Sequence, residues 1–456
     1  MTNPIVFAVI GDSHYVRPES HEKGFSHNTF GDQHDLHRYI HFHQYVIPEI
    51  IGAVAELKPN FIVNTGDVVQ GNCDDAKAAL KEMDEALKRF DKAGAPVFYA
   101  VGNHDGIPHK EPVEQLLYAA NRKALGKPAD QGYYRFVKGN SLFIVLNYYS
   151  FQNNSDQATF IRESLKIGSD YEHVFVFAHP PLVPIIRPFF TNFDFAQTVL
   201  HVAAEYRIDA YFCGHTHNQI ASLHQVADYW LPQLKSCVIG EPGNQPVPIE
   251  EVRPLLPSPE SVELCWGYLE GTAPGWWMVT VDRGQVTVDW HVLGKGPVGQ
   301  LSWEGREKPR MTRKPSLSSP APKELPPVGM MKSVRLRVTG MLCKEDTFKA
   351  SLNGQNAGYF PRMGAFGCRS FLEIDRSMWP AIGVRNRLVV TTAVEEMSIG
   401  GFVLEIETEK GWIRSVPTTF FTNTSRWDKW NTHGLQHIAP GEDIVEELVF
   451  KHDNIM

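Results

Sequence analysis

The feature that most constrains this chain is a series of apolar, strand-like segments, each followed at once by Asp, Asn or His. The strand-like segments are residues 5–10, 61–64, 97–101, 173–177 and 210–213. Segments of helical composition and spacing alternate with them, at residues 36–57, 74–93, 112–124, 156–167 and 195–206. Alternating strands and helices predict a largely parallel sheet that helices cover on both faces. In such a sheet, the residues just beyond the carboxyl ends of the strands form the ligand-binding crevice.

The polar residues at these strand ends form five short blocks rich in oxygen and nitrogen donors. The blocks are Gly11-Asp12-Ser13-His14, Gly66-Asp67, Gly102-Asn103-His104-Asp105, Ala178-His179-Pro180 and Gly214-His215-Thr216-His217. Carboxylate, amide and imidazole side chains are good ligands for divalent first-row metals. Each block alone could be a helix N-cap or a turn. Five of them in order, each at a predicted strand end, indicate a metal site.

In this order the blocks resemble the signature of the calcineurin-like metallophosphoesterases, which is D-x-H, GD, GNHD, H and GHxH. The resemblance covers residues 1–293 and implies an α/β fold, a four-layer sandwich of two β-sheets flanked by helices. It also implies two metal ions bridged by Asp67. The other ligands of one ion would be Asp12, His14 and His217, and the other ligands of the second ion would be Asn103, His179 and His215.

The resemblance implies the chemistry as well. Two metal ions lower the pKa of a bridging water and hold the phosphoryl oxygens, so metal-bound hydroxide would attack the phosphorus. His104 would act as the general acid, because the pKa of imidazole lies near neutrality. Asp105 would orient His104 through its other ring nitrogen. The donor set suits divalent or mixed-valence ions, and manganese, iron and zinc all remain open.

Differences between this sequence and the motifs of other branches of the superfamily limit the reactions to be expected. Purple acid phosphatases have a tyrosine ligand three residues after the bridging aspartate, where this chain has Gln70. Protein phosphatases carry arginines that are missing beside Asn103 and Asp67. The pattern is more similar to bacterial phosphodiesterases, including the cyclic-nucleotide and glycerophosphodiester enzymes, which implies a small phosphorylated substrate. The alternatives are a phosphomonoesterase, a nucleotide pyrophosphatase, or a non-catalytic interaction module of the same fold.

Length and composition limit the remaining possibilities. A chain of 456 residues is too long for one core, so two or more domains are expected. A formal charge of −8 argues against general nucleic-acid binding. No apolar run approaches the ~20 residues of a membrane helix. The six cysteines are scattered without a C-x-x-C pair and no secretory signal is visible, which favours a cytoplasmic protein.

The strand pattern changes along the chain and predicts its domains. A hairpin is expected at residues 133–147, and strands at 220–223, 276–281 and 285–293 would add a second sheet to the catalytic region, 1–293. Residues 294–329, rich in Pro, Ser, Lys and Arg, indicate a linker. From 330 to 456, short alternating strands with turns at Asn353-Gly354 and Gly400-Gly401 predict a smaller all-β sandwich. Its role would be accessory, in specificity or in forming a homo-oligomer.

Histidines are concentrated near the N-terminus, where seven of the 19 lie between His14 and His43. A second metal site is one interpretation, but an irregular loop and helix start at the pocket rim is favoured. The side chains of His34, His37 and His41 could then face the substrate, and Arg17 could approach a phosphate.

Overall fold

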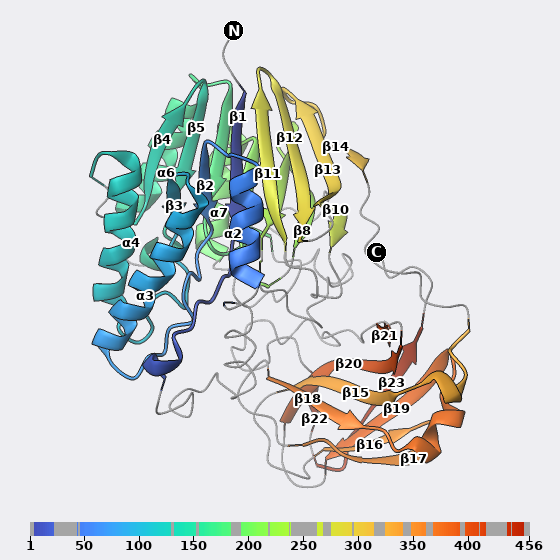
Figure 1. Ribbon diagram of the computed structural model, residues 1–456. Coiled ribbons are helices and arrows are strands. Elements are labelled where there is room, and N and C mark those ends of the chain that lie inside the picture. Colours follow the sequence, from blue (N-terminus) through green and yellow to red (C-terminus); the bar gives the residue numbers. More distant parts are fainter. Residues whose placement is uncertain are drawn as a thin grey trace.

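The protein is described here from a computed structural model with two regions, an α/β region and a region of strands only (Figure 1). The structure describes residues 4–21, 43, 46–128, 132–151, 155–183, 193–217, 219–236, 238, 262–267, 275–293, 296–313, 324–340, 348–361, 368–392, 397–409, 411–415, 436–438 and 440–450. No helix within these ranges is long and apolar enough to cross a membrane.

The first sheet of the α/β region is mixed and has seven strands, in the order β14-β13-β12-β11-β1-β2-β3. β1 pairs with β2 and β2 with β3 in parallel, and the other pairs are antiparallel. The strands are β1 (Ile5–Ile10), β2 (Phe61–Asn64), β3 (Val97–Tyr99), β11 (Gly275–Asp282), β12 (Gln285–Val292), β13 (Gly296–Glu304) and β14 (Arg310–Arg313).

The second sheet is also mixed and seven-stranded, in the order β10-β8-β9-β7-β6-β5-β4. β5, β6, β7 and β9 run parallel, and the predicted hairpin forms β4 and β5. The strands are β4 (Tyr134–Lys138), β5 (Ser141–Val145), β6 (His173–Phe177), β7 (Ala210–Cys213), β8 (Ile220–Val226), β9 (Tyr229–Lys235) and β10 (Val262–Gly267).

The prediction of one largely parallel sheet covered by helices on both faces is therefore wrong in its arrangement. Three of the strands that precede donor blocks lie in the first sheet, and the other two lie in the second. The later strands do not form a sheet of their own either, because β8 joins the second sheet while β11 and β12 extend the first. Each sheet is buried by helices on one face and by the other sheet on the opposite face. A strand buried on both sides has the same apolar sequence in either arrangement.

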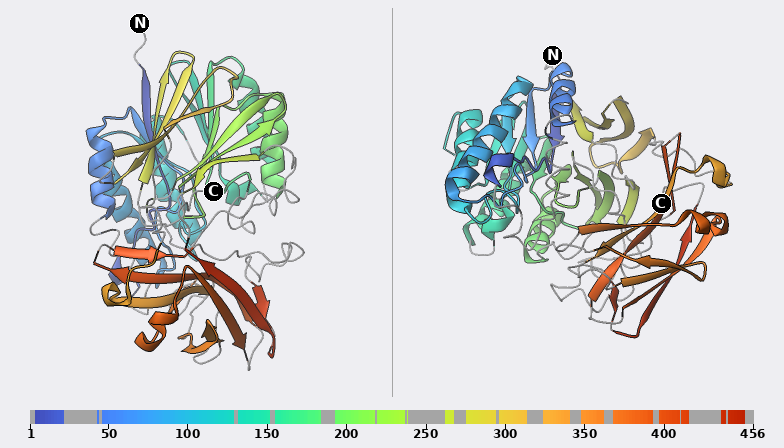
Figure 2. Two further views of the ribbon diagram at one scale, coloured as in Figure 1. Left: turned by 90° about the vertical axis from the view of Figure 1, so that its right-hand side faces the viewer. Right: turned by 60° about the horizontal axis from the view of Figure 1, so that its bottom comes forward.

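Helices cover the outer face of each sheet, as the left view of Figure 2 shows. The predicted helices at 74–93, 112–124, 156–167 and 195–206 are confirmed. On the first sheet lie α2 (Ile47–Glu56), α3 (Ala76–Phe90) and α4 (Lys110–Leu125), and on the second α5 (Tyr148–Phe151), α6 (Ser155–Gly168) and α7 (Phe193–Glu205). Short 3-10 helices are η1 (Pro18–Ser20), η4 (Asp91–Ala93), η7 (Val328–Met330) and η8 (Arg376–Ala381). The Asp75 carboxylate caps α3 by accepting the Ala78 N–H at 2.8 Å.

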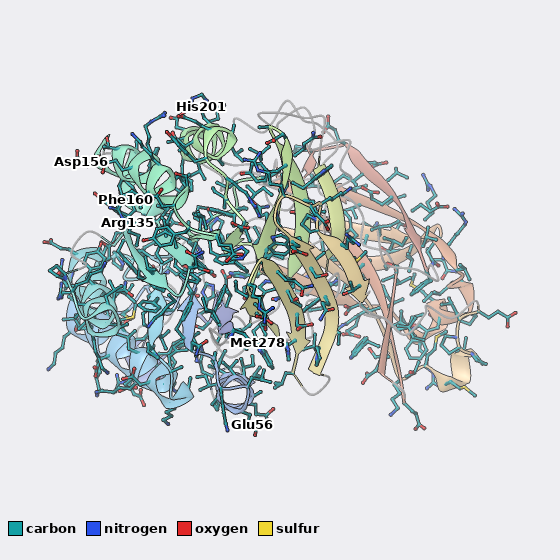
Figure 3. All side chains as sticks on the ribbon, turned by 90° about the horizontal axis from the view of Figure 1, so that it is seen from above. Glu56, Arg135, Asp156, Phe160, His201 and Met278 are labelled. Carbon is teal, nitrogen blue, oxygen red and sulfur yellow. The ribbon has the colours of Figure 1, made fainter. Side chains whose placement is uncertain are left out.

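The core between the two sheets is rich in aromatic side chains. Phe7 of β1 stacks on Phe61 of β2 at 5.1 Å between ring centroids and meets Phe143 of the second sheet edge-on at 5.4 Å. These contacts hold the sheets face to face. At the outer surface, Arg135 of β4 lies beside Phe160 of α6, with the guanidinium carbon 5.5 Å from the ring centroid (Figure 3). The two sheets therefore form one unit whose strand ends have fixed relative positions.

The predicted linker at 294–329 is wrong in its first half. β13 and β14 extend the first sheet beyond β12, and Leu301 and Trp303 of β13 are buried in the core between the sheets. The alternation of buried and partly exposed residues along β13 is typical of a strand, but the flanking Gly, Pro and basic residues concealed it. The α/β region thus extends to Arg313, and residues 314–323 lie outside the described ranges.

The C-terminal region is all-β, as predicted, with two antiparallel sheets around one apolar core. One sheet contains β18-β15-β20-β21 with β22 beside β20, and the other contains β17-β16-β19-β23. The strands are β15 (Ser333–Gly340), β16 (Phe348–Leu352), β17 (Gln355–Tyr359), β18 (Cys368–Glu373), β19 (Arg385–Thr392), β20 (Met397–Thr408), β21 (Gly411–Arg414), β22 (Gln436–Ile438) and β23 (Asp443–Val449).

One predicted turn of this region is a strand irregularity instead. Gly400-Gly401 lies inside β20, where the pairing register with β15 shifts between Arg337 and Thr339. A glycine pair at such a shift marks a β-bulge rather than a chain reversal. Asn353-Gly354 does form a turn, and both residues have positive φ. In Figure 1 the sandwich lies beyond the end of the α/β region toward which β1 and β2 run.

Candidate metal centre

The loops that follow five strands of the two sheets bring the predicted ligands together. Two groups of donor atoms form, and within each group the atoms lie within 4.8 Å of one another. Asp67 belongs to both. The first group is Asp12, His14, Asp67 and His217, and the second is Asp67, His179 and His215. These side chains come from the ends of β1, β2, β6 and β7 and are all buried. The expectation that ligand-binding residues lie just beyond the carboxyl ends of strands therefore located the site, although it assumed one sheet and the structure has two.

The seventh predicted ligand, Asn103, completes the second group. Its Oδ1 lies 3.0 Å from His179 Nε2 and 2.8 Å from His215 Nδ1. Asn103 follows β3, so this group combines residues of both sheets. The structure thus brings all seven predicted ligands to one place, with Asp67 between the two halves.

The backbone at these residues is unusual in a way that sequence patterns could not predict. Five of the seven have φ in the left-handed region: Asp12 (51°), His14 (45°), Asp67 (51°), His215 (76°) and His217 (54°). That conformation costs a non-glycine residue about 1–2 kcal/mol. Strain of this kind is characteristic of functional sites, where surrounding contacts enforce it.

Hydrogen bonds between loops enforce the strained backbone. The Asp12 N–H donates to Gly66 O at 3.1 Å, and the His14 N–H donates to Asp67 O at 2.9 Å. The His215 N–H donates to Asp12 Oδ1 at 2.7 Å. The three loops therefore hold one another, and each ligand is positioned by a loop other than its own.

Two glycines are required at this site because there is no room for a side chain. A Cβ on Gly102 would lie 2.2 Å from Asp67 Oδ1, and one on Gly66 would lie 2.8 Å from His179 Nδ1. Gly66 also has φ of +104°, which other residues rarely adopt. At both positions the backbone therefore approaches a ligand side chain too closely for any residue but glycine.

The ring nitrogens of two histidines show that the donor set fits cations. His14 Nδ1 lies 2.6 Å from Gln70 Oε1, and His179 Nδ1 lies 2.9 Å from Thr65 O. Each Nδ1 must donate to its acceptor, so Nε2 is the nitrogen of each ring that can bind a metal. Against the effect of burial, Asp67 raises the pKa of His179 to about 9, so without metal a proton on Nε2 takes the place of a cation. The Nε2 of His179 then faces the oxygens Asp67 Oδ2 and Asn103 Oδ1, both at 3.0 Å. A positive charge is needed among these electron-rich atoms.

The first group shows the same arrangement. His14 Nε2 lies 2.9 Å from His217 Nε2 and 3.5 Å from Asp67 Oδ2. Asp12 Oδ2 is buried and has no hydrogen-bond partner among the described residues. Burial and the nearby His217 hold the pKa of His14 well below its usual value, so its imidazole is neutral. Neutral imidazole and carboxylate are the forms that bind metal. Residues of both groups therefore fit divalent cations.

His104 is half-buried at the edge of the centre and is oriented differently from the prediction. Its backbone N–H donates to Asp67 Oδ1 at 2.8 Å, and its Nδ1 lies 2.9 Å from Gln70 O. The carbonyl can only accept, so Nδ1 carries a proton and Nε2 remains for other chemistry. The ring centroid of His104 lies 4.7 Å from that of His14.

Asp105 does not make the predicted bond to His104. Its carboxylate accepts four backbone N–H groups, those of Asp67, Val68, Val69 and Gly102, at 2.8–3.2 Å. Burial, and then Asp67, raises the pKa of Asp105 to about 7. Both carboxylate oxygens are occupied by backbone N–H groups of the turn that carries Asp67 and of Gly102, and neither is hydrogen-bonded to the His104 ring. Asp105 therefore holds the ligand loop itself.

Sequence reasoning missed two residues of the site. The Tyr149 hydroxyl donates to Asn103 Oδ1 at 3.1 Å, and Gln70 fixes both His14 and His104. Tyr149 follows the predicted hairpin at 133–147, so its place after a strand could have identified it. Arg17 is turned away, with Nε 3.2 Å from Glu85 Oε1. His43 lies against Ser13 O at 2.5 Å, whereas His34, His37 and His41 are outside the described residues.

Comparison with known proteins agrees with this site. Residues 5–219 match the family model of the calcineurin-like phosphoesterases. No curated protein sequence matches the chain significantly. A dimetal phosphatase from Danio rerio is 13% identical with a TM-score of 0.44, covering 68% of this chain and 99% of that one. A purple acid phosphatase from yellow lupin (Lupinus luteus) seeds is 13% identical with a TM-score of 0.45, covering 67% and 54%. Such distant structural similarity supports no conclusion about the substrate.

Proposed function

We propose, from the family match of residues 5–219, that this protein is a dinuclear metal-dependent phosphodiesterase acting on a small phosphorylated substrate. The observation that carries the proposal is the convergence of seven donors in two groups that share Asp67. A non-catalytic module of the same fold would have no need to keep every donor in place. The alternatives with the same centre are a phosphomonoesterase and a nucleotide pyrophosphatase.

In the proposal, Asp67 would be a ligand shared by two cations. Asp12, His14 and His217 complete one set, and Asn103, His179 and His215 complete the other. When bound, two such ions supply a nucleophile at neutral pH and neutralise charge that builds on the phosphoryl oxygens. Manganese, iron and zinc all suit this mixture of nitrogen and oxygen donors.

His104 is the proposed general acid. Its Nδ1 is fixed on Gln70 O, which leaves Nε2 as the nitrogen that can carry and transfer a proton. The half-buried ring stands beside His14 without being in either donor group. Delivery of the Nε2 proton to the leaving-group oxygen would avoid release of an unstable alkoxide.

Asp105 is a positioning residue in this proposal. Its four backbone hydrogen bonds fix the turn from Asp67 to Val69 and join it to Gly102. Asp67 Oδ1 in turn accepts the His104 N–H. Asp105 therefore acts on His104 through the backbone and the bridging ligand rather than through a ring nitrogen.

The surroundings of the centre favour a diester over a monoester. A monoester dianion is usually held by arginine, whose fork of donors matches phosphate. Arg17 is instead paired with Glu85, and the Lys110 ammonium lies 3.3 Å from Glu114 Oε1. The group that borders the ligands beside Asn103 is the neutral Tyr149 hydroxyl. A diester carries one charge fewer and needs no such cation.

A substrate panel tests this proposal. The full-length protein, loaded with Mn, Zn or Fe, is assayed with bis-p-nitrophenyl phosphate and with p-nitrophenyl phosphate. We expect metal-dependent hydrolysis of both, with kcat/KM at least ~10-fold higher for the diester, the scale of one charged contact. A preference for the monoester would assign the centre to a phosphomonoesterase. Absence of hydrolysis with every metal would contradict an enzymatic role.

The role of the C-terminal sandwich and the location of the protein are also proposals. We place the specificity or assembly function in residues 330–456, because every ligand lies in the α/β region. A cytoplasmic location is supported by free, buried thiols at Cys73 and Cys213.

A further inference from the structure

A second cluster of metal-binding side chains lies outside the centre already described. It contains His21, Cys73 and Glu82, whose donor atoms all lie within 4.8 Å of one another. Glu82 Oε2 is 2.8 Å from His21 Nε2, Cys73 Sγ is 3.3 Å from Glu82 Oε1, and Cys73 Sγ is 4.0 Å from His21 Nε2. Glu82 is fully buried, and His21 and Cys73 are only 4% and 6% exposed. None of the three belongs to the seven ligands.

The cluster joins three separate parts of the fold. His21 directly follows η1 in the segment after β1, Cys73 lies in the segment after β2, and Glu82 lies on α3. The first two segments are those that carry Asp12, His14, Asp67 and Gln70. They also meet through the backbone, since the Asp74 N–H donates to Ser20 O at 2.9 Å. A cation here would fasten both ligand loops to α3.

The donor spacing agrees with a tetrahedral ion. Zinc binds sulfur at about 2.3 Å and nitrogen or oxygen at about 2.0–2.2 Å, which places neighbouring donors about 3.3–3.6 Å apart. The 3.3 Å between Cys73 Sγ and Glu82 Oε1 falls in that range, the 2.8 Å between His21 Nε2 and Glu82 Oε2 is shorter, and the 4.0 Å between Cys73 Sγ and His21 Nε2 is longer. Shifts of about half an ångström would bring the outer two into the range. Cysteine, histidine and glutamate are all established zinc ligands.

The charges also match a divalent ion. One thiolate and one carboxylate balance the two positive charges, and the imidazole binds as a neutral ligand. A buried group of zero net charge avoids the large cost of an uncompensated buried ion. Without the ion, burial and the neighbouring Glu82 raise the pKa of the Cys73 thiol. The thiol therefore stays protonated and donates a hydrogen bond to Glu82. Metal binding would release that proton to solvent.

We propose that His21, Cys73 and Glu82 form a separate, mononuclear site for a divalent metal of the zinc class. The site is structural, because it ties the segment after β1 to the segment after β2 and to α3. It does not depend on the reaction proposed above, since none of its three donors is a ligand of the dinuclear centre.

Cobalt(II) substitution offers a readout that belongs to this site alone. A cobalt–thiolate bond gives a charge-transfer absorption band in the near ultraviolet, and the seven ligands of the dinuclear centre include no sulfur. The full-length protein, stripped of metal and reconstituted with Co(II), is expected to show the band. The Cys73→Ser variant is expected to lose it and to bind one ion fewer per chain. Glu82→Gln, which keeps the size of the side chain, is expected to weaken Co(II) binding by at least ~10-fold.

Two variants serve as controls. Cys213 is the other free, buried cysteine of the described residues, and Cys213→Ser should keep the band. Asp67→Asn should lose metal from the dinuclear centre and still keep the band, so the two proposals fail separately. The inference is overturned if the wild-type protein shows no band, if Cys73→Ser retains it, or if Cys213→Ser abolishes it. Circular dichroism of each variant establishes that a lost band does not reflect unfolding.

Discussion

The α/β region and the C-terminal sandwich are both built from strands around apolar cores, yet they place backbone strain differently. In the α/β region, five ligands at strand ends have positive φ and are buried. In the sandwich, the only described non-glycine residue with positive φ is Asn353, in a tight turn at the surface. A hairpin turn needs that conformation for the chain to reverse. The other non-glycine residues with positive φ in the α/β region, Lys58, Asn72, Ala227 and Arg283, are not buried. Buried strain therefore marks the ligand loops, where it aims side chains inward.

Buried charges differ between the two regions in the same way. In the sandwich, the buried carboxylate of Glu405 is 2.7 Å from Arg335 Nε and 3.7 Å from Arg337 Nη1. That charge is balanced by side chains of the same sheet. In the α/β region, Asp12 and Asp67 lie in one donor cluster whose other members are histidines. Buried charges that are paired within the protein need no ligand. Buried carboxylates without enough positive charge around them favour the binding of a cation.

The largest effect is expected from His104→Ala, which removes the proposed acid without removing a ligand. Metal content should stay at the wild-type level while kcat falls by roughly 10²–10⁴. The loss should be smaller for esters of p-nitrophenol, because that leaving group needs little protonation. Steady-state kinetics with aryl esters of graded leaving-group pKa provide the measurement. An equal loss across the series would remove His104 from proton transfer.

A matched pair of glycine substitutions compares the two regions directly. Gly66→Ala would place a Cβ 2.8 Å from His179 Nδ1, and displacement of that ligand should reduce kcat/KM by about 10²-fold. Gly354→Ala meets no atom within 4 Å, so only its φ of +79° is strained. Its cost should be about 1 kcal/mol of unfolding free energy with activity unchanged. Urea unfolding and steady-state kinetics of both variants provide the measurement. Impaired catalysis in Gly354→Ala would contradict the comparison between the two regions.

Truncation tests where the two regions separate. A chain ending at Arg313 keeps β13 and β14, and its activity toward an aryl phosphodiester should stay within about threefold of the full-length value. A chain ending at residue 293 loses the buried Leu301 and Trp303 and should be destabilised by at least about 5 kcal/mol, the sum of the lower costs for two such side chains. Thermal unfolding and metal analysis of both chains provide the measurement. Insolubility of the longer chain would show that the regions share a core.

The smallest effect concerns acid stability of the α/β region. Burial, with Lys235 nearby, lowers the pKa of His224 to about 3. Because the folded state binds the proton less readily than the unfolded state, the unfolding free energy of the metal-free protein should fall as pH drops from ~6.5 toward 3. His224→Gln should reduce that slope by about 1.4 kcal/mol per pH unit. Urea unfolding between pH 4 and 7 measures it, and an unchanged slope would contradict the assignment.

Much of the site was predictable because its ligands follow buried strands in short, polar blocks. That pattern places Asp12, Asp67 and His179 at strand ends whichever sheet each strand joins. Tyr149 and Gln70 were not identified as site residues. Tyr149 could have been found by its place after a predicted strand, but a single Gln carries no pattern. The positive φ values were equally hidden, since they arise from hydrogen bonds between loops distant in sequence.

The fold was less predictable than the site. A strand covered by a helix and a strand covered by another sheet have the same apolar sequence, so the strand pattern could not show which strands join which of the two sheets implied by the resemblance. β13 was concealed by glycine, proline and basic residues around an alternating core of Leu301 and Trp303. Gly400-Gly401 resembles a turn because glycine serves turns and bulges alike.

The central claim is that Asp67 bridges two metal ions, and metal stoichiometry tests it most directly. Wild-type protein and Asp67→Asn, which keeps the shape of the side chain, are stripped, reconstituted with Mn and analysed by mass spectrometry of the metal. Because Mn is a poor thiolate metal, the count reports the dinuclear centre rather than the Cys73 cluster. We predict two Mn per chain for the wild type and less than one for Asp67→Asn, with loss of phosphodiesterase activity. Two tightly bound Mn in Asp67→Asn, or none in the wild type, would contradict the account.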